Sequence, residues 1–276
     1  YSLSANGYAD NMEAIVYGSP VYEPKFERRG IYEVCTDIAD RLGIKDEFTD
    51  GGKTREDWLR QILDESREKY PELPYYMFGH SMGSMIARDF SAKYGEELDG
   101  AIYCGTTGIF KNTHEVRAKL DAVIEAGGAH DSDPAFVGEL MGWMFSRCAE
   151  GANLGNEWIC HDPYVQKDHA EDPFDAFTHP THNISLRDFI DMMLCIEGEE
   201  WAEKVPEDLP ILLVAGDQDP VGNFGEGVYQ VANWLTDTGH DVITKLYSGY
   251  RHEIHNYDDI KDDVEQTIIE WIEMQF

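Results

Sequence analysis

The sequence predicts an α/β fold in which a mostly parallel sheet carries helices on both faces. From residue 74 onward, short apolar runs of strand length alternate with helical patterns, as is typical of chains that build parallel sheets. The polar and aromatic stretch 113–204 has helical patterns and no convincing strand. The sequence therefore predicts one sheet whose strands are separated by a long helical insertion.

The first strand and helix of this pattern enclose residues 79–83, with the sequence Gly-His-Ser-Met-Gly. Residues 75–78 are an apolar strand pattern and residues 84–94 a helical one. G-x-S-x-G between a strand and a helix is the nucleophile elbow of α/β-hydrolases, so we expect Ser81 to be a nucleophile. A serine hydroxyl is a poor nucleophile unless a sharp turn exposes it to a base and to free backbone N–H groups. We expect both glycines to leave room for the strained backbone and for close approach of helix to strand.

The remaining elements continue the alternation. Strand patterns lie at 98–105, 210–216 and 241–247, with helices at 225–236 and 258–274. Because ligands bind at the carboxyl ends of parallel strands, a helical insertion there is placed to cover a substrate. These patterns divide the chain into an atypical amino-terminal segment 1–73, a first core part 74–112, a helical cap 113–204 and a second core part 205–276.

A nucleophilic serine needs a base, and that base needs a carboxylate to orient it. In α/β-hydrolases the acid and then the histidine follow the serine along the chain, each on a loop after a strand. Asp219 and His252 stand in such loops, so we assign Asp219 as the acid and His252 as the general base that activates Ser81. Asp217 and His255 are the alternatives. We favour the first pair because Asp217 is close enough to its strand to cap the turn, and His255 lies nearer the final helix.

The other histidines are given structural roles. His80 adjoins the nucleophile but its ring cannot easily reach the serine oxygen, so we expect it to pack beside the elbow. A polar group in the helical insertion fits no familiar zinc spacing and is interpreted as surface or capping residues: His161, Asp162, His169, His179 and His182. The predicted chemistry needs no metal and no cofactor, and none is predicted.

Composition excludes several classes of function. The 276 residues include 22 basic and 54 acidic side chains, and the formal net charge of −32 opposes binding to nucleic acid or to anionic membrane surfaces. No apolar run approaches the roughly 18 residues of a membrane span. Five scattered cysteines without a CxxC pair, and an amino terminus without a basic leader or an apolar signal core, favour reduced thiols in the cytoplasm. The sequence does not indicate an oligomeric state.

Three segments together resemble one family. Residues 79–84, 216–222 and 251–253 are similar to the monoacylglycerol lipase and lysophospholipase group of α/β-hydrolases, often labelled serine aminopeptidase-like, and the likeness covers roughly residues 65–276. The resemblance implies cleavage of a small-molecule acyl ester through an acyl-enzyme on Ser81, beneath a helical cap. Peptidases, thioesterases and lipases share this mechanism, so acylglycerol or lysophospholipid esters are favoured on the resemblance alone.

Apolar side chains of the insertion are candidates for lining an acyl site. They are Trp143, Met144, Met192 and Met193, with Met141 and Phe145 close by in sequence. Methionine and aromatic residues at helical spacing also build ordinary cores, so packing is the alternative interpretation.

The amino-terminal part departs from this group. Its members carry an early strand that ends in a His-Gly turn and supplies one oxyanion N–H, whereas the first histidine here is His80. The N–H of Met82 remains as an oxyanion donor, and loss of one such donor costs about 3–4 kcal/mol of transition-state stabilisation. We therefore expect the early strands to be missing or replaced. A catalytically impaired or inert fragment is the alternative to an active hydrolase, and a binding protein on a hydrolase scaffold is a third possibility.

Residues 1 to about 70 are similar instead to part of the molybdopterin oxidoreductases of the dimethyl sulfoxide reductase type. The likeness runs through residues 8–10, 20–24, 32–43 and 48–58. The segment contains no metal-ligating or cofactor-phosphate motif, so no redox function is inferred. The chain is interpreted as a chimera joined near residues 68–71. The alternative is a divergent hydrolase with a strand at 13–18 and helices near 32–42 and 55–69.

Overall fold

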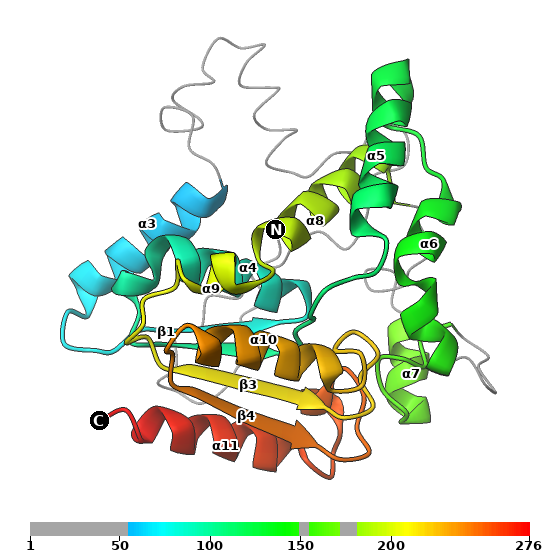
Figure 1. Ribbon diagram of the computed structural model, residues 1–276. Helices are drawn as coiled ribbons and strands as arrows, with labels where there is room; N and C mark the ends of the chain where they lie inside the picture. The colour runs from blue at the N-terminus through cyan, green and yellow to red at the C-terminus, as the bar shows by residue number, and fades with distance from the viewer. Residues whose placement is uncertain (1–54, 149–154, 172–180) are drawn as a thin grey trace. The chain divides into compact units, whose positions relative to one another are not determined.

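The computed structural model describes residues 55–148, 155–171 and 181–276 (Figure 1). These residues fall into two compact units. One contains helix α3 (Arg55–Lys69), which matches the helix expected near 55–69. The other contains the sheet and the remaining helices. The segments that resemble the oxidoreductases lie outside the described residues, apart from residues 55–58, and so does the alternative strand at 13–18.

The sheet consists, over these described ranges, of four parallel strands in the order β1-β2-β3-β4. The strands are β1 (Tyr76–His80), β2 (Gly100–Cys104), β3 (Ile211–Gly216) and β4 (Val242–Tyr247), close to the predicted positions. The predicted parallel sheet is therefore confirmed. Its register places His80 beside Cys104 and Cys104 beside Val214, so that the carboxyl ends of the strands meet at one edge.

Helices connect and cover the strands. They are α4 (Met82–Tyr94), α5 (Thr113–Val123), α6 (Pro134–Phe145), α7 (Pro163–Glu171), α8 (Asn183–Cys195), α9 (Glu199–Ala202), α10 (Glu226–Asp237) and α11 (Lys261–Glu273). Four short helical segments complete the fold: η1 (Gly95–Glu97), η2 (Ile124–Gly128), η3 (Ser146–Cys148) and η4 (Ile254–Asn256). Helices α5 to α9 lie between β2 and β3 in the chain, as predicted for the insertion. None of the helices in the described ranges is long and apolar enough to cross a bilayer.

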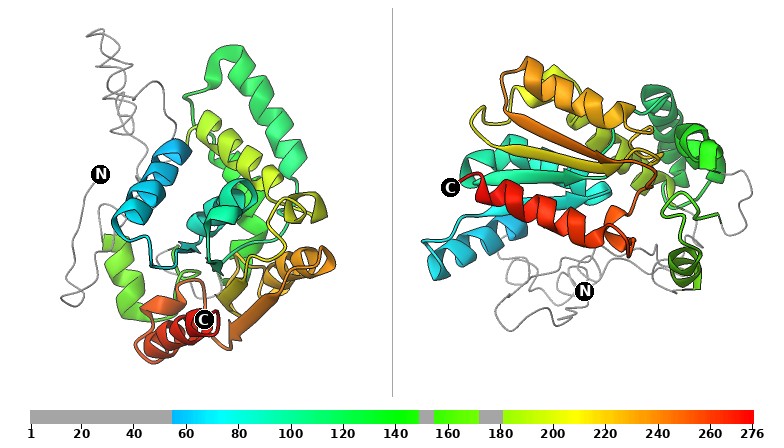
Figure 2. Two further views of the ribbon diagram at one scale, coloured as in Figure 1. Left: turned by 90° about the vertical axis from the view of Figure 1, so that its left-hand side faces the viewer. Right: turned by 90° about the horizontal axis from the view of Figure 1, so that it is seen from below.

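The two faces of the sheet are covered by different helices. Tyr103 and Leu213 belong to the larger hydrophobic cluster, whereas their chain neighbours Ile102 and Leu212 belong to a smaller one. Successive side chains of a strand point to opposite faces of the sheet, so burial of both neighbours means that the sheet is covered on both faces. Helix α10 covers the face of the larger cluster, and α11 covers the opposite face through Trp271 (Figures 1 and 2).

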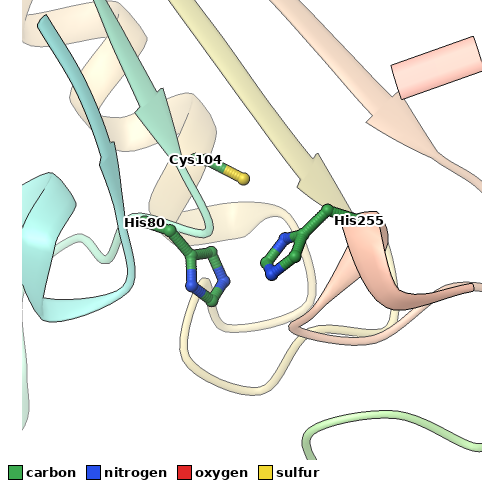
Figure 3. A group of neighbouring side chains, drawn as sticks. All are labelled: His80, Cys104 and His255. Carbon is green, nitrogen blue, oxygen red and sulfur yellow. The ribbon is translucent and has the colours of Figure 1, made fainter. Parts of the chain in front are cut away.

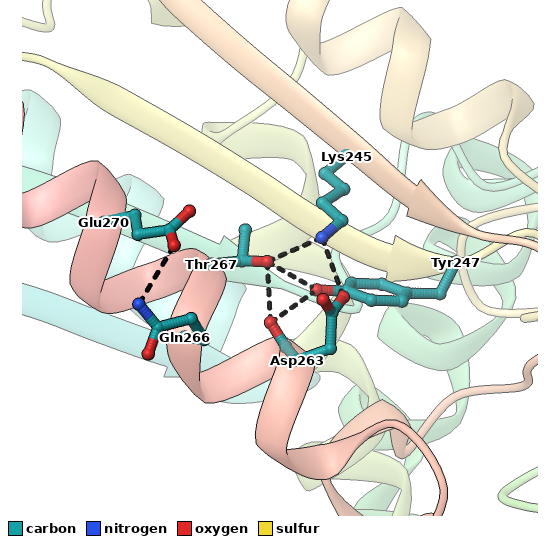
Figure 4. A network of polar contacts seen from close by, with 6 residues as sticks. All are labelled: Lys245, Tyr247, Asp263, Gln266, Thr267 and Glu270. Atoms are coloured by element: carbon teal, nitrogen blue, oxygen red, sulfur yellow. Dashed lines mark hydrogen bonds and ion pairs between the residues drawn. The ribbon is translucent and has the colours of Figure 1, made fainter.

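Polar contacts fix α11 against β4 (Figure 4). Lys245 Nζ donates to the Asp263 carboxylate over 2.8 Å and to Thr267 Oγ1 over 2.6 Å. The Tyr247 hydroxyl lies 2.9 Å from the same Thr267 oxygen. The loop that joins β4 to α11 is therefore anchored at both ends, and this loop carries the predicted catalytic histidine.

Candidate active site

The turn between β1 and α4 has the backbone of a nucleophile elbow. Ser81 has a φ of 57° and a ψ of −126°, a conformation that residues other than glycine rarely adopt. Its N–H donates to the Cys104 carbonyl over 3.0 Å, and its own carbonyl accepts from the Ser84 N–H over 2.8 Å. These bonds hold the strained residue, half-buried, at the carboxyl edge of the sheet.

Only one of the two motif glycines is required by close packing. A Cβ on Gly79 would lie 2.2 Å from the carbonyl oxygen of Gly83, so no side chain fits there. A Cβ on Gly83 would meet no described atom within 4 Å. The expectation that Gly83 also makes room for close approach is therefore wrong, because Gly79 faces the first turn of α4 whereas Gly83 faces open space.

Asp219 and His252 form a buried pair on the loops after β3 and β4. His252 Nδ1 lies 2.9 Å from Asp219 Oδ2, and the two side chains are 2% and 0% exposed. The second carboxylate oxygen, Oδ1, accepts the Val221 N–H over 2.8 Å. Because an ionised carboxylate only accepts hydrogen bonds, this contact assigns the proton of a neutral His252 to Nδ1 and leaves Nε2 as a base.

The His252 ring lies next to the elbow, across the end of β2. A Cβ on Gly105, which has a φ of +57°, would lie 3.2 Å from the His252 ring and 3.3 Å from the His80 ring, so glycine lets both rings approach. His252 Nε2 is buried and has no hydrogen-bond partner among the described residues, so its bond to Ser81 is not formed here. Catalytic hydrogen bonds are often long in the absence of substrate.

Asp217 and His255 do not join this buried pair. The Asp217 carboxylate accepts the Gly249 N–H over 2.7 Å and the Ser248 hydroxyl over 2.8 Å, so it caps the loop after β4. Partial burial opposes ionisation, but these hydrogen bonds prevail and lower the pKa of Asp217. His255 is exposed on η4, and its ring packs against His80 with centroids 4.6 Å apart.

His80 packs beside the pair. Its Nε2 lies 3.1 Å from the main-chain oxygen of His252, and the two ring centroids are 4.7 Å apart. Burial, with His252 and His255 nearby, holds the pKa of His80 well below its usual value. Burial and the nearby Asp219 carboxylate raise the pKa of the Cys104 thiol. Nitrogen and sulfur atoms of His80, Cys104 and His255 lie within 4.8 Å of one another, in the one group of the described chain with the spacing of metal ligands.

Arg88 of α4 ties the helical insertion to the sheet. It is 1% exposed, donates to the Thr107 carbonyl after β2 over 2.7 Å, and also donates to the Ile196 carbonyl after α8. Its guanidinium lies 4.5 Å from the ring centroid of Trp201, whose indole N–H donates to the Arg88 carbonyl over 3.0 Å. Burial lowers the pKa of Arg88 to about 9. The insertion is thus anchored at its far end by one buried cation.

The residue predicted to be the oxyanion donor, Met82, begins a helix. Met82 is the first residue of α4, where a backbone N–H has no partner within the helix, and it directly follows Ser81. Among the described residues β1 pairs with β2 alone, so no described strand stands on the other side of the elbow. The structure therefore brings together, at one edge of the sheet, a serine with a strained backbone, the buried His252–Asp219 pair and the first N–H of α4.

Comparison with known proteins identifies the family. A family model described as serine aminopeptidase, S33, matches residues 54–259. The chain belongs to this family. A thermostable carboxyl esterase from Bacillus coagulans, solved in complex with glycerol, is 50% identical, with a TM-score of 0.75 over 80% of this chain and 71% of that chain. A lipase in an open form is 31% identical, with a TM-score of 0.69 over 80% of this chain and 72% of that chain. The predicted α/β-hydrolase fold is confirmed.

Two further relatives correspond to the two resemblances. Monoacylglycerol lipase from Mycolicibacterium smegmatis is 26% identical over 222 residues, 76% of this chain and 68% of the lipase. A short amino-terminal stretch is similar to dimethyl sulfoxide reductase DmsA from Haemophilus influenzae, 42% identical over 74 residues, or 27% of this chain and 9% of the reductase. The chain thus spans about a tenth of the length of the reductases it matches.

The four residues predicted to line an acyl site in this serine aminopeptidase family member fall into two groups. Met144 and Met193 are 1% and 2% exposed and belong to the larger hydrophobic cluster. Trp143 and Met192 are half-buried and pack against that cluster. Helices α6 and α8 turn Met144 and Met193 into this cluster, as the packing interpretation expects. Trp143 and Met192 remain candidates for lining.

Trp158 also lies beside His252, although no pattern in the sequence pointed to it. Its ring centroid lies 5.1 Å from that of His252 and 4.9 Å from that of Phe145. It is half-buried in a turn before α7. A single tryptophan outside any helical pattern gives no periodic signal, and only its position near the end of the insertion could have drawn attention to it.

Within the described part of the chain, the polar residues of the insertion lie apart from one another. Asp162 accepts a backbone N–H in the first turn of α7 over 2.8 Å. His161 Nδ1 lies 3.1 Å from the Tyr257 hydroxyl, and His182 directly precedes α8. These positions agree with capping and surface roles. His179 lies outside the described residues.

Proposed function

We propose that this chain is a serine hydrolase that cleaves carboxylic esters through an acyl-enzyme on Ser81. The observation that carries the proposal is the buried contact of 2.9 Å between His252 Nδ1 and Asp219 Oδ2, beside a serine with a strained elbow backbone. A buried carboxylate that accepts from one imidazole nitrogen orients the other nitrogen as a base. The membership in a hydrolase family supports the same conclusion.

In the proposed reaction, His252 Nε2 takes the proton of Ser81 Oγ as that oxygen attacks the ester carbonyl carbon. Asp219 stabilises the imidazolium, and the Met82 N–H donates to the developing oxyanion. The imidazolium then gives its proton to the departing alcohol oxygen, which leaves an acyl-enzyme. Water, deprotonated by the same Nε2, attacks the acyl carbon; the bond to Ser81 Oγ then breaks, the imidazolium returns its proton to that oxygen, and the carboxylic acid leaves.

We propose acylglycerol or lysophospholipid esters as the substrates. The monoacylglycerol lipase and the glycerol-bound carboxyl esterase among the relatives support this choice. In the insertion, Phe145 and Trp158 form an aromatic path whose last ring lies 5.1 Å from the His252 ring, as an acyl chain next to the base would need. We propose that Trp143 and Met192 extend this apolar lining and that residues 113–204 act as the cap.

The decisive test is labelling with a fluorophosphonate probe, which reacts with activated serines. We expect the unaltered chain to be labelled and the Ser81→Ala variant to be unlabelled. Equal labelling of both would refute the proposed nucleophile. The substrate class is tested by comparing a monoacylglycerol, a lysophospholipid and an aminoacyl p-nitroanilide. Preference for the anilide would show a peptidase instead.

A second candidate is a catalytically impaired fragment. The observation that favours it is the pairing of β1 with β2 alone in the described part of the sheet, which leaves the Met82 N–H without a described second oxyanion donor. An impaired fragment would turn over p-nitrophenyl esters no faster than Ser81→Ala, whether or not the fluorophosphonate labels Ser81. Turnover that depends on Ser81 would exclude it.

We also propose a cytoplasmic location. The cysteines within the described residues, Cys104, Cys148, Cys160 and Cys195, are free thiols, which supports a reducing compartment. Mass measurement of the chain isolated from its host under thiol-blocking conditions tests this. Intact disulfides would contradict it.

A further inference from the structure

His80, Cys104 and His255 converge beside the proposed catalytic base, at the ends of β1 and β2 and on η4 (Figure 3). We propose that these three side chains bind one divalent transition-metal ion of the zinc type, and that the bound ion inhibits hydrolysis. The binding stands on its own geometry. The inhibition rests on the proposed function.

The spacing fits a metal after a small adjustment. The candidate ligand atoms lie within 4.8 Å of one another. Zinc binds histidine nitrogen at about 2.0–2.1 Å and cysteine sulfur at about 2.3 Å, so neighbouring ligands of a tetrahedral site lie roughly 3.3–3.8 Å apart. Cys104 is 1% exposed and fixed within the sheet, whereas His255 is exposed on a short helical segment. Rotation of the His255 side chain toward the other two shortens the distances between the ligand atoms to those that zinc requires.

The donor set selects the class of ion. Two imidazoles and one thiol suit zinc and related borderline or soft ions, whereas magnesium and calcium require oxygen ligands. As the sulfur–metal bond forms, the Cys104 thiol releases its proton to solvent. Three protein ligands leave a fourth position for water. The formal net charge of −32 raises the local concentration of cations around the chain.

The site is coupled to the base through His80. The Nε2 of His80 lies 3.1 Å from the main-chain oxygen of His252, and Figure 3 shows the His80 and His255 rings turned toward one another. A metal on the His80 ring competes with this contact and draws His255, three residues from the base, toward the elbow. The backbone of His252 then shifts, and with it the imidazole that must stay aligned with Asp219 and Ser81. A misplacement of about 1 Å can cost 10²-fold in rate.

Cobalt(II) titration of the full chain, after chelator treatment, tests the binding. We expect a sulfur-to-cobalt charge-transfer band that saturates at one ion per chain. The Cys104→Ser variant should lack the band. The His255→Ala variant changes an exposed residue that the fold tolerates, and it should weaken metal binding more than about tenfold. Even the loss of a residue that only hydrogen-bonds to a ligand commonly lowers metal affinity by about this factor.

Matched controls are Cys195→Ser and His130→Ala, which alter an exposed cysteine and an exposed histidine elsewhere in the chain. Both should keep the band and the affinity. Absence of the band from the unaltered chain, or its loss in Cys195→Ser with retention in Cys104→Ser, overturns the site. Unchanged affinity in His255→Ala also overturns it, because the rings would then be packed together without a ligating role.

Inhibition is measured as ester turnover with zinc and then with excess chelator. We expect zinc to suppress turnover of the unaltered chain at least tenfold, with recovery on chelation, and to leave the turnover of His255→Ala nearly unaffected relative to its own zinc-free rate. Full turnover with the cobalt-defined site saturated refutes the inhibition. If the chain hydrolyses no ester, the proposed function fails and the inhibition fails with it, while the charge-transfer result still decides the binding.

Discussion

Replacing Asp219 by Asn changes the hydrogen-bonding character of the buried acid and keeps its shape. Asp219 Oδ1 accepts the Val221 N–H over 2.8 Å, so the Asn amide oxygen must stay at that place. The amide NH₂ group then faces His252 Nδ1, 2.9 Å away, where a carboxylate oxygen stood. A donor there forces Nδ1 to accept, which moves the imidazole proton to Nε2. The ring can then no longer take the proton of Ser81.

The size of the effect follows from the tautomer. In a serine protease triad the same wrong tautomer lowers kcat by about 10⁴-fold, which is about 5.5 kcal/mol at 1.4 kcal/mol per tenfold. We expect Asp219→Asn to lower kcat for a p-nitrophenyl ester by about 10³–10⁴-fold. The Michaelis constant should change by less than about threefold, because the 0% exposed Asp219 side chain does not reach the substrate.

Asp217→Asn is the matched control, since it makes the same chemical change two residues away. Asp217 accepts from the Gly249 N–H and the Ser248 hydroxyl and has no contact with His252 among its described hydrogen bonds. The Asp217→Asn change should lower the free energy of unfolding by about 1 kcal/mol and kcat by less than about tenfold. Both variants are assayed at the temperature where circular dichroism shows each to be folded. If Asp219→Asn retains more than a tenth of the activity, or if Asp217→Asn loses as much, the assignment of the acid is wrong.

Three further substitutions probe the surroundings of the site. Gly79→Ala should destabilise the chain by at least about 1–3 kcal/mol, because its Cβ would lie 2.2 Å from the Gly83 carbonyl oxygen, while Gly83→Ala, which faces open space, should be tolerated; urea unfolding compares the two, and equal losses would contradict the packing. Arg88→Met leaves two buried carbonyls without a donor and should cost about 2–5 kcal/mol in the same assay; a neutral outcome would show that the insertion is anchored elsewhere. The folded state lowers the pKa of His80, so below about pH 6.5 the unfolded state binds more protons than the folded state, and stability decreases by up to about 1.4 kcal/mol per pH unit as pH falls. His80→Gln, measured with chelator present, should make the dependence of stability on pH less steep. An unchanged dependence would show that it comes from other groups.

Local patterns in the sequence were sufficient for the elements and their order. Alternating apolar runs and helical patterns predicted all four described strands and the insertion between β2 and β3, because strand and helix periods depend only on which faces are buried. The motif at 79–83 predicted the strained turn at Ser81, since a G-x-S-x-G between strand and helix has few other backbone solutions. The order of acid and histidine loops came from the same reasoning.

Only the tertiary structure decided which side chains from distant segments meet. Asp217 and Asp219 stand two residues apart in one loop, and only the packing of β3 against β4 shows which of them meets His252. The ring of Trp158 beside that histidine, and the meeting of Cys104 with two imidazoles, likewise arise from segments far apart in the chain. Periodicity reports which face of an element is buried, but not which neighbour lies against it. The register between parallel strands fixes those neighbours, and that register is set by long-range packing rather than by any local stretch of residues.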